Sequence, residues 1–340
     1  MKKLAYFFII ATGSILALIY GKTMMIQFVV AFLLWFATFQ INKSFCKIKW
    51  FKRFIPGIFQ YIIVAALLIL VLYLVMNMVM NNLMYLSSSF SNYENNINTV
   101  TSKIDDLFQI DIKKEVNTFI RSLNIKYIIS GLTESLSNIF SNFTMILIYL
   151  LFFFLETKSV KLKLKALFPD PDKRKKFDMT LAKIEKSLAQ YFHVKTLISI
   201  LTGMLSFAVL KFIGVDAALF WAFLIFALNY IPTIGSLIAT IFPAVFSLLQ
   251  FGSFMIFILI LLLIGSIQMI AGNVVEPKLM GKTLNVSPMV TILALAFWGK
   301  LWGVTGTLFS VPITVIIIII LSQFKSTEKI AVILSEKGDL

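Results

Sequence analysis

The sequence has 340 residues and a net charge of +15, with 59% hydrophobic and only 14% charged residues. A soluble domain carries roughly 25% charged residues, so this composition excludes an ordinary soluble protein. The basic excess does not indicate nucleic-acid binding, because Lys and Arg gather in short connections between hydrophobic runs. That is the positive-inside pattern of cytoplasmic loops in membrane proteins, and no nucleic-acid partner is expected.

Long runs without any charged residue recur along the chain. They cover residues 4–21, 23–42, 54–93, 135–155, 217–275 and 301–324. About 20 helical residues cross the bilayer core, and the run 217–275 is long enough for more than one crossing. The sequence therefore predicts an all-α polytopic transmembrane protein of about eight spans, with the lipid bilayer as its partner.

Residues 1–80 are expected to hold the first three spans, at about 4–21, 23–41 and 55–80. Lys2 and Lys3 precede the first span and place the N-terminus in the cytoplasm, and no small-x-small cleavage site marks this span as a signal peptide. Residues 81–137 form a polar extracytoplasmic insert. Apolar residues recur in it at near-helical spacing from Ile110 to Leu132, which predicts a solvated helical cap. The fourth span follows at 138–155.

Residues 156–195 form a basic cytoplasmic loop with eleven Lys or Arg against five Asp or Glu. After Pro169 and Pro171, an apolar stripe runs from Phe177 to Phe192 at helical spacing. This pattern predicts a separate amphipathic helix that lies in the headgroup region on the cytoplasmic face.

Residues 196–324 are predicted to form a transport core. After a span at 196–213, the segment 217–229 is too short to cross a bilayer, and Pro232 and Gly235 separate it from 236–251. A full span at 253–272 leads to Pro277. The short segment 287–298 and the segment 304–323 are likewise separated near Gly303. Both Pro/Gly-broken hairpins can either span or re-enter. In either case the chain leaves on the side it entered, so the tail 325–340 is expected in the cytoplasm.

Interrupted helices indicate a substrate path, because freed backbone groups survive at membrane depth only inside protein or beside a polar cavity. The path is expected to comprise Asn229, Pro232, Gly235, Gln268, Asn273, Glu276, Pro277, Gly303 and Gly306. Asp216 and Lys278 are secondary candidates. Glu276 can serve a cation or proton, or form a structural latch with Lys278, and Asp216 is expected in an interfacial turn.

The two broken hairpins are weakly alike in sequence. Thr233-Ile234-Gly235-Ser236-Leu237 resembles Val304-Thr305-Gly306-Thr307-Leu308, and a proline follows each. One hairpin is expected to begin outside and the other inside, which suggests inverted repeats.

Enzyme chemistry is not expected. One histidine cannot build a zinc site of the His-Glu-x-x-His type, and no glycine-rich phosphate loop appears. A single cysteine excludes a cysteine metal cage. We therefore expect no cofactor and no metal, and transport driven by an ion gradient or by the flow of substrate.

Several motifs together resemble one family. They are Asn229-Tyr230-Ile231-Pro232-x-Ile234-Gly235, Glu276-Pro277-Lys278-Leu279-Met280-Gly281-Lys282 and Phe297-Trp298-Gly299-x-Leu301-Trp302-Gly303-x-x-Gly306. With Pro243, Pro288 and Pro312, they are similar to the autoinducer-2 exporter family of bacterial membrane transporters. The sequence departs from that pattern at His193-Val194-Lys195, where the family commonly has a glycine.

The resemblance implies a secondary transporter that exports a small molecule across the bacterial inner membrane. Sodium (or lithium)/proton antiport, found in other members, is the alternative within transport. The resemblance also implies a homo-oligomer, with a pentamer as the expected size. A non-transporting membrane scaffold is the alternative of another class, and the interrupted helices argue against it because a scaffold does not need them.

Overall fold

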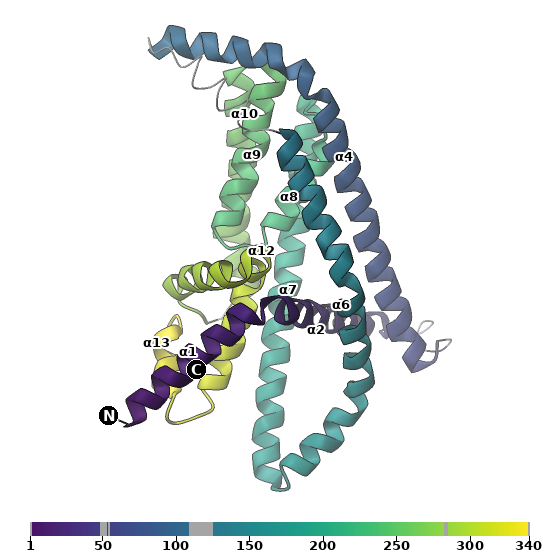
Figure 1. Ribbon diagram of the computed structural model, residues 1–340, viewed down its shortest axis with the longest axis vertical. Helices are drawn as coiled ribbons and strands as arrows, with labels where there is room; N and C mark the ends of the chain where they lie inside the picture. The colour runs from purple at the N-terminus through teal and green to yellow at the C-terminus, as the bar shows by residue number, and fades with distance from the viewer. Residues whose placement is uncertain (1, 48–52, 54, 109–124, 282–284, 339–340) are drawn as a thin grey trace. The chain divides into compact units, whose positions relative to one another are not determined.

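The structure is a computed structural model that describes residues 2–47, 53, 55–108, 125–281 and 285–338 (Figure 1). All regular elements in these ranges are helices. They are α1 Lys2–Tyr20, α2 Lys22–Phe45, α4 Gly57–Phe108, α6 Ile125–Leu167, α7 Pro171–Ile213, α8 Ala218–Leu228, α9 Ile234–Phe251, α10 Phe254–Ile270, the π-helix η1 Ala271–Val275, α11 Glu276–Met280, α12 Pro288–Leu321 and α13 Glu328–Leu334.

Six helical stretches among the described residues are long and apolar enough to cross a membrane. They are Lys22–Phe45, Phe59–Leu86, Pro171–Ile213, Ile234–Phe251, Phe254–Met280 and Pro288–Leu321, with shorter apolar helices at Phe143–Thr157 and Ala218–Leu228. The predicted all-α polytopic membrane fold is confirmed. Much of the extracytoplasmic insert's apolar pattern, from Ile110 to Leu123, lies outside the described residues.

The chain divides into two compact units, each built from separate stretches. Unit 1 comprises Met1–Tyr73, Asn138–Ala189 and Thr283–Leu340, and unit 2 comprises Leu74–Ser137 and Gln190–Lys282. The helices α4, α6 and α7 each contain residues of both units.

Unit 2 is organised around the pair α9 and α10, which lie side by side (Figure 1). Gly265 of α10 meets Thr240 of α9, and a Cβ at Gly265 would lie 3.7 Å from the Thr240 methyl group. Fully buried Ile225, Ala239, Ile260 and Ile264 form part of the core, with Trp221 at its edge. Small side chains on facing helices allow this close approach, as is usual for helices in membranes.

In unit 1, the first half of α12 packs on α1 and α2. The indoles of Trp298 and Trp302 have ring centroids 5.0 Å apart, and Trp302 Nε1 donates to the Leu18 carbonyl at 3.3 Å. A second cluster joins Ala31 of α2 to Ile146 and Leu150 of α6. These contacts pair helices that are distant in sequence within the unit.

Both broken hairpins predicted in the C-terminal half are present, and each contains a residue with positive φ. The chain reverses between α8 and α9 at Thr233, with φ 56°, and α12 is interrupted at Gly303, with φ 64°. Pro243 and Pro312, in contrast, lie inside continuous helices. The breaks therefore lie at residues with positive φ, whereas the two prolines remain within helical backbone.

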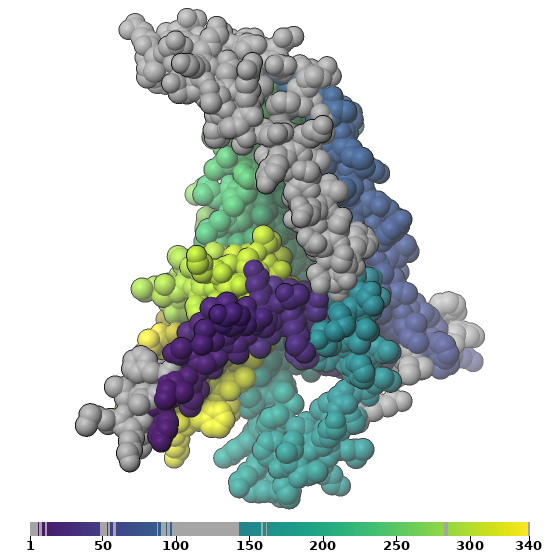
Figure 2. Space-filling view, in the orientation of Figure 1, coloured from purple at the N-terminus to yellow at the C-terminus, as the bar shows by residue number. Residues whose placement is uncertain are grey.

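The separate amphipathic helix predicted within 156–195 is wrong. Its residues form the first half of α7. This helix is 43 residues long and continues without a break into the next span. Proline and Asp172 lie only in its first turn, and no later breaker stops it. At 1.5 Å per residue α7 is about 64 Å long, so it extends beyond a bilayer core. The α6–α7 turn is teal in Figure 2, and near it Leu162 and Leu167 are 72% and 70% exposed.

Candidate functional site

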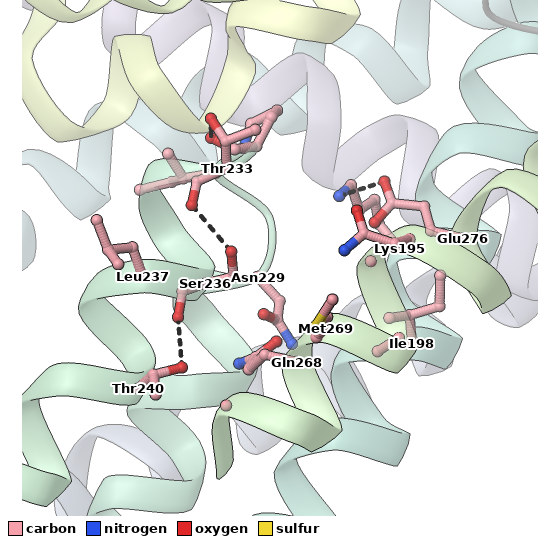
Figure 3. Close-up of a pocket in the computed structure, with 16 residues that line it drawn as sticks. Lys195, Ile198, Asn229, Thr233, Ser236, Leu237, Thr240, Gln268, Met269 and Glu276 are labelled. Carbon is pink, nitrogen blue, oxygen red and sulfur yellow. Dashed lines mark hydrogen bonds and ion pairs between the residues drawn. The ribbon is translucent and has the colours of Figure 1, made fainter. Parts of the chain in front are cut away.

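A cavity of about 600 Å³ lies within unit 2 (Figure 3). Its wall comes from α7, the α8–α9 connection, the first turns of α9, the end of α10 and the π-helix η1. Its polar lining residues are Lys195, Asn229, Thr233, Ser236, Thr240, Gln268, Asn273 and Glu276. The α8–α9 break and the irregular end of α10 therefore share one cavity.

The two charged side chains that line the cavity form an ion pair. Lys195 Nζ lies 2.5 Å from Glu276 Oε1, with the side chains 6% and 24% exposed. Each charge is costly to bury alone and tolerable when paired. The structural latch with Lys278, one of the alternatives for Glu276, is not formed, since Glu276 pairs with Lys195 instead. Residues two apart on a helix do not face each other, and Lys278 is exposed.

Two amide side chains face the same cavity. Asn229 Nδ2 donates to Thr202 Oγ1 of α7 in the short hydrogen bond that fixes its orientation. Gln268 is 7% exposed, and its Nε2 has no partner among the described residues. A buried amide donor without a partner is costly, so this group is available for a ligand or for water.

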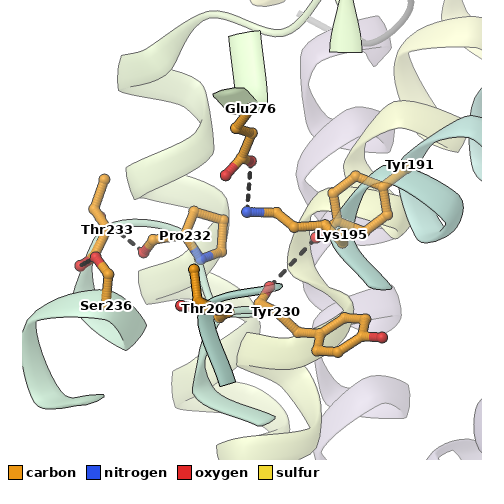
Figure 4. Close-up of polar contacts among 9 residues, drawn as sticks. Tyr191, Lys195, Thr202, Tyr230, Pro232, Thr233, Ser236 and Glu276 are labelled. Carbon is orange, nitrogen blue, oxygen red and sulfur yellow. Dashed lines mark hydrogen bonds and ion pairs between the residues drawn. The ribbon is translucent and has the colours of Figure 1, made fainter. Parts of the chain in front are cut away.

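Side chains from one stretch of α7 form hydrogen bonds with the α8–α9 connection and with the end of α11. Figure 4 shows the contact with the α8–α9 connection. Tyr191 Oη donates to the Tyr230 carbonyl at 3.3 Å, and Thr196 Oγ1 lies 2.7 Å from Tyr230 Oη. Gln190 Nε2 donates to the Met280 carbonyl at 3.0 Å. These bonds satisfy groups freed where the helices are interrupted, as burial requires.

The span that was expected at 253–272 continues as helix past Pro277. The chain stays helical through Met280, and the π-helix η1 occupies Ala271–Val275 directly before Glu276. Proline has no N–H, and its ring clashes with the carbonyl four residues earlier. A π-turn widens the helix at that point and accommodates the ring. The helix ends instead at Gly281, with φ 55°.

The predicted path residues divide between the units. Asn229, Pro232, Gln268, Asn273 and Glu276 line the cavity. Gly235 supports it by fixing the α8–α9 turn, because a Cβ there would lie 1.9 Å from the Leu228 oxygen.

Gly303 and Gly306 belong to unit 1. Gly306 makes a similar close approach, with a Cβ there placed 1.9 Å from the Trp298 oxygen. Pro277 begins α11 beside Glu276.

Asp216 lies in a turn, as expected, and outside the cavity lining. Tyr93 Oη of α4 donates to Asp216 Oδ2 at 2.5 Å, and the Asp216 backbone N–H donates to Gln250 Oε1 at 2.8 Å. Burial of the ring, together with this hydrogen bond and the Asp216 charge, raises the pKa of the Tyr93 hydroxyl. This cluster ties α4 to the α7–α8 turn and the end of α9.

Sequence reasoning missed Lys195, Ser236 and Thr240. Lys195 was grouped with the basic cytoplasmic residues because it directly precedes an apolar run, and only its burial distinguishes it from them. Ser236 and Thr240 are one helical turn apart at the start of α9. That spacing after a break is the signal that could have indicated them.

Among the described residues, no group of three or more His, Cys, Asp or Glu side chains could hold a metal ion. The polar groups of the cavity can instead form hydrogen bonds with a solute and neutralise charge.

A helical membrane protein whose interrupted helices enclose a polar cavity has the architecture of a transporter. The chain belongs to the AI-2E transporter family, since the model described as AI-2E family transporter matches residues 6–326.

The AI-2 transport protein TqsA of Escherichia coli K12 is 34% identical over 82% of this chain and 80% of its own length. A protein of Borreliella burgdorferi named as a transport protein is 34% identical over 71% of this chain and 67% of its own length. The family relationship points to transport and away from catalysis.

Proposed function

We propose that this chain is a secondary transporter that exports a small molecule across the bacterial inner membrane, with the unit 2 cavity as its solute site. The observation that carries the proposal is the cavity between two irregular helix segments, half of whose lining residues are polar. A volume of about 600 Å³ suits a small solute. The unpartnered Gln268 amide offers it a hydrogen bond.

The name of the Escherichia coli relative makes AI-2 the first cargo to test. The cavity chemistry is compatible with a neutral polar molecule. Lys195 and Glu276 compensate each other's charge, and the remaining polar groups are amides and hydroxyls.

Sodium (or lithium)/proton antiport is the second candidate. It is favoured by one observation, the Glu276 carboxylate inside the cavity, because an acidic group at membrane depth is a common site for a coupling ion.

The test compares fluxes in proteoliposomes that contain the full-length chain. AI-2 efflux and sodium-driven proton movement are measured for the native protein, for Glu276→Gln and for Gln268→Ala. Loss of Gln268's donor should reduce solute flux about fivefold or more, the value of one hydrogen bond of about 1 kcal/mol. Glu276→Gln should reduce whichever flux the cavity carries about tenfold or more, since it leaves Lys195 buried without its counter-charge.

Glu328→Gln is the matched control, because Glu328 lies in the first turn of α13 in unit 1. Its flux should equal that of the native chain. Unchanged flux in both cavity variants would reject the cavity as the solute path, and sodium-coupled flux without solute flux would favour antiport.

We also propose that both termini lie in the cytoplasm and that the protein is a homo-oligomer, with a pentamer as the expected size. The cytoplasmic placement is supported by Lys2 and Lys3 and by the basic connection 156–195.

A further inference from the structure

The cavity is lined by several side-chain oxygen groups of the kinds that bind alkali cations. The Glu276 carboxylate, the side-chain oxygens of Asn229 and Gln268 and the hydroxyl of Ser236 line one space (Figure 3). Oxygen atoms of these types bind hard cations, often where a membrane helix is interrupted. The positive charge at the carboxylate, however, comes from the chain itself, because Lys195 Nζ lies 2.5 Å away.

Lys195 is firmly held in this position. Its side chain is 6% exposed. The residue after it, Thr196, is bonded to Tyr230 Oη at 2.7 Å, and Tyr191 one turn earlier donates to the Tyr230 carbonyl (Figure 4). These bonds hold the α8–α9 connection against α7 on both sides of Lys195, and the Lys195 ammonium contacts Glu276.

We propose that Lys195 determines the specificity of the cavity by acting as a tethered cation that excludes sodium and lithium from Glu276. The proposal rests on the proposed function, because it concerns the same cavity, and it names the ions that the native cavity rejects. Replacement of Lys195 by a neutral residue exposes a cation site built from Glu276 and the neighbouring oxygens.

The exclusion has a simple physical basis. A group attached to the chain competes at an effective concentration in the millimolar range or above, and here no ordering remains to be done. An external alkali ion would also lose its hydration shell and leave the buried Lys195 ammonium without a partner. A neutral solute meets neither obstacle.

The test measures equilibrium binding of radioactive sodium to the full-length chain in lipid nanodiscs. The native chain should show no saturable binding that depends on Glu276. Lys195→Met keeps an unbranched side chain one atom shorter and removes the charge. It should bind sodium saturably, at about tenfold or more above the background signal of the native chain, because it leaves a buried carboxylate uncompensated. The double variant Lys195→Met with Glu276→Gln should lose that binding.

Two controls separate exclusion from general charge effects. Lys195→Arg keeps the positive charge and should behave as the native chain does. Lys211→Met removes an exposed lysine from the same helix, outside the cavity lining, and should also leave sodium binding at the native level.

Glu276-dependent sodium binding by the native chain would overturn the proposal, and so would Lys195→Met binding no more than the native chain does. Lys195→Gln repeats the test if Lys195→Met does not fold, and the native arm decides in any case. Binding is measured without any flux, so a cavity that fails as a solute path can still pass or fail this test on its own.

Discussion

Gly235 and Gly306 show how single residues permit the interrupted helices. At each position a Cβ would come within 2 Å of a backbone oxygen from before the interruption, that of Leu228 in α8 and that of Trp298 in the first half of α12. Backbone cannot move aside as a flexible side chain can, so only glycine allows these close turns. The two hairpins share this local device although their sequences match only weakly.

We expect Gly235→Ala to destabilise the protein by about 1–3 kcal/mol, the usual cost of overpacking. The matched control is Gly265→Ala in the same unit, where the nearest atom to the added Cβ lies at an ordinary 3.7 Å. Thermal unfolding of the purified variants measures both. Equal stability of the two variants would contradict the close approach at Gly235.

Tyr93 gives a prediction for alkaline pH. Its raised pKa, caused first by burial and then by Asp216, means that the folded state keeps the hydroxyl protonated after the unfolded state, with its pKa near 10.0, has begun to ionise. The contribution of the Tyr93 hydroxyl to the free energy of unfolding is fully present below pH 10 and is lost as the pH rises further. At pH 8, Tyr93→Phe should be less stable by about 1 kcal/mol, the value of one hydrogen bond.

The difference between Tyr93→Phe and the native chain should shrink as the pH is raised above 10. Tyr20→Phe is a suitable control, since Tyr20 is 86% exposed. A stability difference that stays constant across this range would show that the Tyr93 hydroxyl is not held protonated by its surroundings.

Among the elements, α7 has the largest role in unit 2. Residues 190–202 of this helix bond to the α8–α9 connection through Tyr191, Thr196 and Thr202, and to α11 through Gln190. The irregular segments therefore depend on one regular helix for their hydrogen bonds.

Gln190→Ala should loosen α11 specifically. Removing the donor to the Met280 carbonyl lowers the free energy of local opening by about 1 kcal/mol, which corresponds to roughly fivefold faster amide exchange. Hydrogen exchange of the peptide covering residues 276–281 measures this. Gln323→Ala in unit 1 serves as the control, and unchanged exchange in α11 would contradict the role of Gln190.

At the scale of the whole molecule, charge placement predicts the orientation of the chain in the membrane. Basic residues dominate 156–195, whereas 217–275 has no charged residue. We expect reporter fusions at both termini to be active only in the cytoplasm. An extracytoplasmic C-terminus would mean that one hairpin crosses the membrane an odd number of times.

Native mass spectrometry tests the expected homo-oligomer.

The membrane class and the places where the helices break could be predicted from the sequence. The bilayer core selects continuous apolar helices of about 20 residues, and the hydropathy and charge of such a stretch can be read from neighbouring residues. Thus the turn near Pro232 and the interruption at Gly303 were indicated by their own residues. The family relationship was likewise carried by local motifs.

The tertiary structure alone decided which residues share the cavity. The pairing of Lys195 with Glu276 joins α7 to α11, and no local pattern encodes which distant groups packing will bring together. The sequence therefore determined that this is a membrane protein whose helices are interrupted near Pro232 and Gly303. Packing decided that the acid in the cavity already holds a cation from its own chain.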